Sequence, residues 1–467
     1  MADIIVTCET LTPMITSGAD QSEFELRADT VKSLLRFWWR AFHVFDTIEE
    51  LREQETALFG GSTGTRKNAA PFRISVRVTE LKPAKKEDLG FSASNSPRSY
   101  FYFPLRPGKF GMPRDAATPN FEIFIRAIQT AEQAKDLLRS LWLLEHLGAI
   151  GSRSRRGAGS FEVKEVKLVD APQEILEDIN HLYPHPQSFF IDKDELRRGL
   201  TSSIRRILDA WGPKTDPGAA LPCYSRISDR ARICIVTKPN GDPLSLMDDL
   251  ADHMRNFRNG ESGFGKAPLP GGSSVFRKEA RIMHERIDSL LNGSTLVAGP
   301  TTVMKPEFGL PIQYRFGGQS KPPCPEPVGF NAIPASERTR NGQTSLHKLD
   351  RRASPLFLSF GQFGADGNRS SYCILTYLPA EFVTGETGDR PVVAFKAVHD
   401  TKKIENLINN KKKPPSRNYK LWLENRLTTA LSPTTQLDLA SFKADLEIGA
   451  VEAYLNDLTC KMNCFDL

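Results

Sequence analysis

The chain has 467 residues, of which 39% are hydrophobic and 25% are charged, and its net charge is +6. This composition is that of a globular protein and excludes a wholly disordered chain, while the length suits two large or three small domains. The mild positive charge does not by itself identify a nucleic-acid partner, because such a partner requires clustered basic residues.

The first 170 residues alternate between strand and helix patterns. Helices are expected at 30–45, where Asp29 or Thr30 would cap the N-terminus, and at 130–147. Strands are expected at 3–8, 72–78, 100–103, 121–128 and 161–168. The order strand, helix, strand, strand, helix, strand, with excursions, is that of a split βαβ unit. It predicts a ferredoxin-like (RRM-like) domain over residues 1–170.

The remaining residues, 171–467, are less regular, and a second domain of the same class with insertions and C-terminal helices is expected there. Helices are predicted at 193–211, 243–257, 275–291, 418–430 and 441–457. Strands are predicted at 223–236, 311–315, 355–360 and 371–377, and loops at 258–274 and 317–345; a further loop is predicted at 82–98 in the first domain. The predicted fold class is therefore α+β, with two tandem ferredoxin-like domains and loop insertions.

The cysteine spacing and the first ten residues indicate the cellular compartment, and the cysteine spacing also bears on metal binding. Seven scattered cysteines lack metal-ligand spacing, so neither a disulfide scaffold nor a zinc ribbon is expected, and we expect no cofactor and no metal. The start, MADIIVTCET, lacks the basic and apolar regions of a secretory signal, and no apolar run approaches ~18 residues. A cytoplasmic protein without membrane contact is expected.

Basic residues gather on one face of the helix expected at 30–45. At about 100° per residue, one narrow stripe opposite the apolar face holds Lys32, Arg36, Arg40 and His43. Trp39 falls beside this stripe, and Arg27 precedes the helix on the same approach. Cations for phosphates and an indole for a base suit single-stranded nucleic acid. The alternative is a solvated helix face with a tryptophan snorkelling at its border.

A second basic cluster lies in the glycine-rich loop at 148–160. Its arginines and glycines are Arg153, Arg155, Arg156, Gly148, Gly151, Gly157 and Gly159. Glycines allow the backbone to approach a ligand and to form anion-binding nests, and arginines bind phosphates through two N–H groups. Neither a Walker loop nor a dinucleotide fingerprint is present. Anion binding is expected here, and the alternative is a flexible basic turn.

A catalytic set is not evident. The eight histidines are isolated, and neither HExxH nor GxSxG occurs. Asp20 or Asp29 could orient an attacking 2′-hydroxyl and His43 could act as a general base. Asp29 is more simply a helix cap and His43 a member of the basic stripe, so no enzyme activity is expected.

Several motifs resemble the RAMP superfamily of CRISPR proteins and, more narrowly, the first subunit of the Cmr (type III-B) effector complexes. The residues that carry the resemblance are Glu25-Leu26-Arg27, Lys32, 35–41 (LRFWWRA), 58–61 (LFGG), 148–160, 308–312 (FGLPI) and 352–356 (RASPL). The match is strong over 1–168 and patchy over 280–380. The chain departs from the family pattern at Ala28-Asp29, before the helix, where Pro-Ser types are more usual. This departure leaves an acidic side chain near the expected path of the RNA phosphates.

The resemblance implies two ferredoxin-like domains and a non-catalytic RNA-binding subunit. Such a subunit caps the backbone at the 3′ end of the guide crRNA and helps bind target RNA in antiviral defence. Its partners are guide crRNA, target RNA and other Cmr subunits, especially a neighbouring RAMP subunit at the same end. The family motifs match Arg27, Lys32, Arg36, Arg40, Arg153, Arg155 and Arg156, and the full predicted RNA-binding set adds Trp39, His43, Gly151, Gly157 and Gly159.

Two other functions fit the same residues. One is a metal-independent RAMP endoribonuclease that processes guide RNA or cuts target RNA through His43, Asp20 or Asp29. The other is a scaffold whose basic loops meet acidic faces of partner subunits.

Overall fold

The structure is a computed structural model of the chain. The residues that it describes are 2–20, 23–45, 47–63, 66–91, 96–103, 116–170, 173–183, 190, 192–209, 222, 224–259, 279, 282, 302–303, 305–308, 312–315, 328–340, 343–348, 353–364, 369–380, 390–399, 409, 441–446, 450–462 and 464–466. Two compact units form within the chain: unit 1 comprises residues 1–255, 356–380 and 455–467, and unit 2 comprises residues 256–355 and 381–454.

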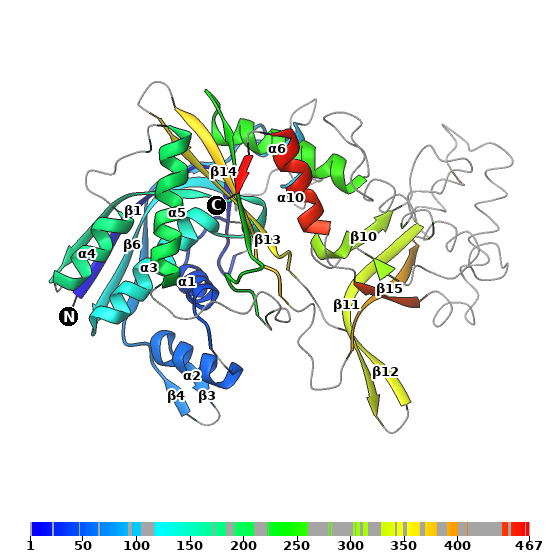
Figure 1. The fold of residues 1–467 in the computed structure, drawn as a ribbon, viewed down its shortest axis with the longest axis horizontal. Coiled ribbons are helices and arrows are strands. Elements are labelled where there is room, and N and C mark those ends of the chain that lie inside the picture. The colour runs from blue at the N-terminus through cyan, green and yellow to red at the C-terminus, as the bar shows by residue number, and fades with distance from the viewer. Residues whose placement is uncertain are drawn as a thin grey trace. The chain divides into compact units, whose positions relative to one another are not determined.

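Unit 1 contains a first, antiparallel sheet in the order β5-β6-β1-β7 (Figure 1). Its strands are β1 (Ala2–Thr10), β5 (Arg73–Pro83), β6 (Ala116–Ile128) and β7 (Phe161–Val169), and the short β2 (Met14–Ile15) also pairs with β6. Helix α1 (Ala28–Phe42) follows β1, and α3 (Ala131–Leu147) follows β6. The succession is β1, α1, β5, β6, α3, β7, and the predicted order of these elements is confirmed.

The core of the first sheet follows from alternation along its strands. Ile4 and Val6 of β1 and Ile123 and Ile125 of β6 are almost fully buried and belong to one cluster with apolar residues of α1 and α3. Alternate residues of a strand point to opposite faces, so this inner face carries the helices. The intervening residues form an outer face.

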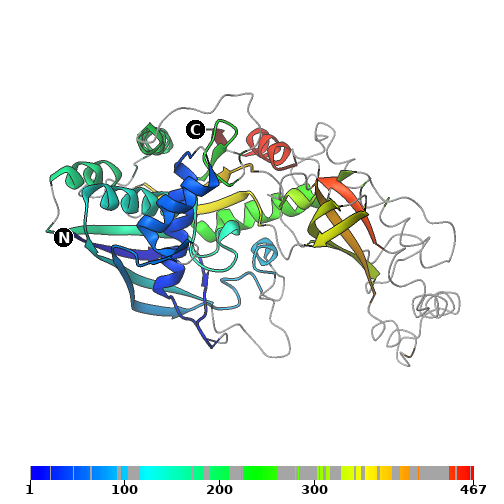
Figure 2. The same cartoon turned by 90° about the horizontal axis from the view of Figure 1, so that it is seen from below.

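Figure 2 shows the ribbon from a second direction, and unit 1 contains further elements besides this sheet and its two helices. They are α2 (Ile48–Phe59), β3 (Gly61–Thr63), β4 (Arg66–Asn68), the 3₁₀ helices η1 (Pro97–Tyr100) and η3 (Ser154–Arg156), α4 (Gln173–Leu182) and α5 (Lys193–Asp209). Helix α2 was not predicted. Its N-cap is Thr47, whose hydroxyl accepts a hydrogen bond from the Glu50 amide at 3.1 Å.

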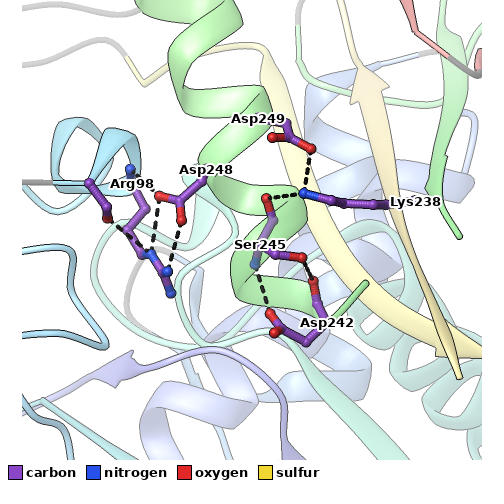
Figure 3. Close-up of polar contacts among 7 residues, drawn as sticks. Arg98, Lys238, Asp242, Ser245, Asp248 and Asp249 are labelled. Carbon is purple, nitrogen blue, oxygen red and sulfur yellow. Dashed lines mark hydrogen bonds and ion pairs between the residues drawn. The ribbon is translucent and has the colours of Figure 1, made fainter. Parts of the chain in front are cut away.

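A second antiparallel sheet has the order β13-β14-β8-β17. Its elements are β8 (Arg232–Lys238), α6 (Pro243–Asn259), β13 (Leu356–Phe363), β14 (Ser370–Tyr377), α10 (Ala450–Lys461) and β17 (Cys464–Asp466). Figure 3 draws the residues around the start of α6. There Asp242 accepts a hydrogen bond from the Ser245 amide at 2.7 Å, and Asp249 forms a 2.7 Å ion pair with Lys238 at the end of β8.

Unit 2 contains a sheet in the order β10-β11-β15-β16-β9, with β12 paired to β11. These strands are β9 (Thr302–Val303), β10 (Ile312–Arg315), β11 (Val328–Arg340), β12 (Gln343–Lys348), β15 (Arg390–His399) and β16 (Ser441–Leu446), and η4 spans Lys305–Phe308. The pairing of β9 with β16 is parallel, and the other pairs are antiparallel.

The α+β class is confirmed, and several predicted elements are wrong. The strand expected at 100–103 is preceded by the 3₁₀ helix η1 and is not extended. The helix expected at 441–457 is a strand, β16, followed by α10, and the loop expected at 317–345 contains parts of β11 and β12. The loop at 82–98 begins within β5 and ends within η1. Most of the segments at 258–274 and 275–291, and all of 418–430, lie outside the described residues.

The cysteines differ in state. Cys8 and Cys373 are free and buried, whereas Cys234 on β8 is disulfide-bonded. The scattered cysteine pattern did not predict this bond. Among the described residues, no helix is long and apolar enough to cross a membrane.

Candidate nucleic-acid interface

Helix α1 begins two residues before its predicted start. Its N-cap is Arg27, in an extended conformation and without a side-chain cap hydrogen bond, so the prediction of an Asp29 or Thr30 cap is wrong. Asp29 lies exposed in the first turn, where a carboxylate interacts favourably with the helix dipole. Arg27 is exposed on the same approach, as predicted.

A pocket of about 420 Å³ opens beside the first half of α1. Its lining comes from α1, the end of α2 and the segment after β4, and consists of Asp29, Lys32, Ser33, Arg36, Phe59, Gly60, Gly61, Asn68, Ala69 and Ala70. Lys32 is partly buried, and its ammonium lies 5.9 Å from the centre of the Phe72 ring. The pocket therefore brings two members of the predicted stripe, Lys32 and Arg36, together with glycines, an amide and the Asp29 carboxylate.

The arginines of the stripe share one carboxylate. Arg36 Nε and Arg40 Nη1 donate to the same oxygen of Glu55, at 2.5 and 2.7 Å, and Glu55 is only 5% exposed. About a third of each arginine side chain remains exposed. Since each guanidinium has five N–H donors and gives one to Glu55 in these bonds, further donors are left for an anion. Glu55 thus holds the two cations in place and cancels one of their charges.

Trp39 and His43 do not lie on the stripe surface. Trp39 is 3% exposed, and its indole N–H donates to Asp136 of α3 at 2.9 Å. His43 is fully buried, with Nε2 3.6 Å from the same carboxylate. The prediction of an exposed aromatic at the stripe's edge is wrong, because α2 covers that flank and its Phe59 ring lies 6.0 Å from Trp39.

The glycines of the 148–160 loop face the protein interior. Gly151, Gly157 and Gly159 all have positive φ. A Cβ at Gly157 would lie 2.2 Å from the Phe360 ring of β13, and one at Gly159 would lie 2.0 Å from the Ile150 carbonyl oxygen. The close approach that these glycines permit is therefore to neighbouring chain segments of unit 1, which corrects the expectation that they admit a ligand.

The three arginines of this loop are held by protein contacts. Arg153 Nε donates to the Phe101 carbonyl at 2.8 Å, and the Arg155 guanidinium lies 4.3 Å from the centre of the Phe357 ring. Arg156 is 8% exposed. Arg153 is exposed and Arg155 is partly so, and these two present charge to solvent from a fixed loop.

The residues considered for catalysis differ in accessibility. Asp20 and Asp29 are exposed, whereas His43 has no exposed surface with which to reach a substrate hydroxyl. Within the described residues, no group of three or more His, Cys, Asp or Glu side chains could hold a metal ion.

Sequence reasoning missed Glu55, and it noted Gly60 and Gly61 only as part of a family motif (58–61) without assigning them to a site. A usable signal was present, since Thr47 and Glu50 have the S/T-x-x-E spacing that marks a helix start. That signal predicts a helix with a carboxylate-rich first half, whereas its packing against the stripe is a tertiary contact that only the structure shows.

Comparison with known proteins identifies the family. The family model described as "RAMP superfamily" matches residues 7–162. The Pyrococcus furiosus protein "CRISPR system Cmr subunit Cmr1-2" is 31% identical over 191 residues, which are 36% of this chain and 98% of that protein. The chain belongs to the Cmr1 family of the RAMP superfamily. This confirms the resemblance seen in the sequence.

A second relative is covered less completely. "CRISPR system Cmr subunit Cmr1-1" of P. furiosus is 30% identical over 214 residues, or 44% of this chain, and the chain spans 57% of that relative's length.

Two solved structures were also matched. The apo crystal structure of Cmr1 from P. furiosus has 18% identity and a TM-score of 0.46, covering 84% of this chain and 92% of that one. A chain of the type III-B Cmr-beta complex bound to cognate target RNA has 12% identity and a TM-score of 0.45, covering 92% and 100%.

Proposed function

We propose that the chain is a non-catalytic RNA-binding subunit of a type III-B CRISPR (Cmr) interference complex. In this role it caps the backbone at the 3′ end of the guide crRNA and helps bind target RNA in antiviral defence. The observation that carries the proposal is the pocket at α1, where Lys32 and the Glu55-held Arg36 converge beside two glycines. The choice of complex rests on the two P. furiosus relatives, both of which are named as Cmr subunits.

The physical support is the preorganisation of the cations. A phosphate that enters the pocket meets the Lys32 ammonium and the Arg36 guanidinium. Because Glu55 already holds that guanidinium in place, less side-chain entropy is lost on binding. The exposed Arg27 and the outer part of Arg40 extend the same positive surface along α1. A backbone of phosphates, rather than one anion, suits such a row of cations.

The proposed RNA-binding set is narrower than the predicted one. It comprises Arg27, Lys32, Arg36 and Arg40 on α1, with Arg153 and Arg155 from the glycine-rich loop as a second contact. The set leaves out three buried side chains, which support α1 and the loop from inside the protein: Trp39, His43 and Arg156. Gly151, Gly157 and Gly159 act by letting the loop pack closely.

We also propose two tandem ferredoxin-like domains, the first over 1–170 and the second over 171–467. The order 2-3-1-4 of the four long strands of the first sheet and of the four strands of the second supports this, since β5-β6-β1-β7 and β13-β14-β8-β17 both occur. In each, a helix follows the first and the third strand. Unit 2 would then consist of insertions into the second domain, after α6 and after β14.

The proposed partners are guide crRNA, target RNA and other Cmr subunits, chiefly a neighbouring RAMP subunit at the same end of the complex. Such a complex acts on RNA inside the cell, so we place the chain in the cytoplasm.

The test is a gel shift with end-labelled, guide-length RNA in EDTA over a salt series. Lys32→Ala/Arg36→Ala should weaken binding and lower the slope of log affinity against log salt by about 1.4, because two phosphate contacts are lost. A matched variant, Arg52→Ala/Lys193→Ala, removes two exposed positive charges from α2 and α5 and should leave the slope nearly unchanged.

Equal slopes for both variants would reject the α1 pocket as the RNA site. The same samples run on a denaturing gel test for cleavage. Shortened RNA would contradict the non-catalytic role and would favour the endoribonuclease, with Asp20 and Asp29 as the first residues to change.

A further inference from the structure

The outer face of the first sheet carries an aromatic side chain that is not part of the core. Ile123 and Ile125 of β6 point inward and are buried, so Phe124 between them points to the opposite face. Phe124 is partly exposed and does not belong to the core cluster. Its cross-strand neighbours are Ser75 on β5 and Ile5 on β1. Ser75 is exposed and too short to cover the ring.

Two guanidinium groups flank this ring. The Arg126 guanidinium lies 5.1 Å from the centre of the Phe124 ring, and that of Arg77 lies 5.5 Å away. Arg77 also donates to Glu122 at 2.7 Å. Both guanidinium groups lie over the ring. An aromatic ring together with guanidinium planes matches a nucleotide, because a base can stack on either and the phosphates are negative.

A pair of like charges lies beside the ring. Arg73 of β5 is directly opposite Arg126 of β6, and both are exposed. Among the described residues, no carboxylate forms an ion pair with either of them. Like charges directly opposite on neighbouring strands destabilise a sheet. A bound phosphate between them would remove that repulsion.

We propose that the outer face of the first sheet binds single-stranded RNA, with one base stacked on Phe124 and a neighbouring phosphate held by Arg73 and Arg126. This site is separate from the α1 pocket, and it rests on the proposed function only in taking RNA as the ligand. An arginine pair to which no described carboxylate is bonded favours a phosphate backbone over a protein partner, because an anion would neutralise both guanidinium groups.

The test measures affinity and cross-linking with the full chain. Phe124→Ala should weaken binding of guide-length RNA by about 5- to 150-fold, the range found when a base loses an aromatic stacking partner, without changing the salt slope. Arg73→Ser/Arg126→Ser should lower the slope by up to about 1.4. 4-Thiouridine-labelled RNA should cross-link to a peptide that contains residues 116–128.

Two further variants of Phe124 and a stability measurement distinguish a loss of base stacking from a loss of folding. Phe124→Tyr keeps an aromatic face and should restore near wild-type affinity, whereas Phe124→Leu keeps the apolar contact and should not. Thermal unfolding should be similar for the three Phe124 variants, since the ring lies outside the core.

Each outcome has a distinct meaning. Wild-type affinity for Phe124→Ala, with cross-links confined to the α1 region, would overturn the sheet site and leave the proposed function intact. Cross-links at 116–128 together with an unaffected Lys32→Ala/Arg36→Ala variant would support the sheet site and reject the α1 pocket. Normal RNA binding by Phe124→Ala with loss of assembly into the complex would assign this face to a protein partner instead.

Discussion

At the scale of single residues, Glu55 decides how the cations of α1 behave. Its carboxylate is nearly buried and accepts from both Arg36 and Arg40. A carboxylate in this position fixes two long side chains, and it also lowers the positive charge that RNA would meet. The two effects can be separated, because glutamine has nearly the same shape and no charge.

Glu55→Gln should lower the free energy of unfolding by about 1–2 kcal/mol, a range reduced for the partial exposure of both arginines. It should also steepen the salt dependence of RNA binding, since one more positive charge is left for phosphate. Urea unfolding and the gel-shift salt series measure the two effects. An unchanged urea midpoint would mean that this ion-pair cluster does not stabilise the fold.

A second buried acid, Glu145 on α3, predicts how stability changes with pH. It is 8% exposed and accepts a hydrogen bond from the Val163 amide at 2.7 Å. Burial raises its pKa to about 8, so the carboxyl is protonated in the folded protein at neutral pH. In the unfolded chain a glutamate ionises near pH 4.3. Its contribution to stability is therefore complete below about pH 4.3 and is lost as the pH rises to about 8.

Glu145→Gln should abolish this pH dependence while keeping an oxygen that accepts from Val163. The variant should gain roughly 2–4 kcal/mol over the wild type at pH 8 and nothing at pH 4. Urea unfolding of both proteins across this pH range gives the difference directly. A constant difference at every pH would show that Glu145 ionises similarly in both states.

At the scale of elements, an ion pair joins two segments that are far apart in the sequence. Arg98 of η1 contacts Asp248 of α6 through its backbone amide at 2.8 Å and its guanidinium at 2.8 Å (Figure 3). The two side chains are 16% and 20% exposed. Because the connection between β5 and β6 is long, this contact ties it to the helix of the second sheet.

Asp248→Asn should lower the free energy of unfolding by about 1–3 kcal/mol, since it leaves a partly buried guanidinium without its counter-charge. The control is Asp252→Asn on the same helix. Asp252 pairs with Arg255, and these side chains are 31% and 45% exposed, so its change should cost less than about 0.5 kcal/mol. Similar losses for the two variants would argue against a special role for the Arg98 contact.

Comparing the helices and strands with their predicted positions shows how much of the fold the sequence could predict. Local patterns located α1, α3, β1, β6 and β7 closely, because amphipathic alternation depends on near neighbours in the chain. The same patterns placed Trp39 on the surface, because the helix that covers it, α2, was not expected. They assigned the loop glycines to a ligand, because the contact of Gly157 with Phe360 joins residues about two hundred positions apart. Phe124 was taken only as part of a strand, since its exposure depends on the sheet order.

At the scale of the whole molecule, the first sheet connects the two proposed RNA sites. Lys32 of the α1 pocket lies over Phe72, which is buried on the helix side. The next residue, Arg73, lies on the outer face opposite Arg126. A single RNA strand could therefore pass from the pocket around the start of β5 to Phe124, and the two sites would act on one ligand.

This arrangement predicts that RNA length changes the effect of Phe124→Ala. For guide-length RNA the second contact is intramolecular, so its loss should weaken binding by the full factor of about 5- to 150-fold. For an oligonucleotide of about four nucleotides, the lower end of the site size of one single-strand-binding fold, each site binds independently. Loss of one of two comparable sites should then weaken the apparent affinity by only about twofold. Fluorescence anisotropy with both RNAs gives the two ratios, and equal ratios would mean that the sites bind separate strands.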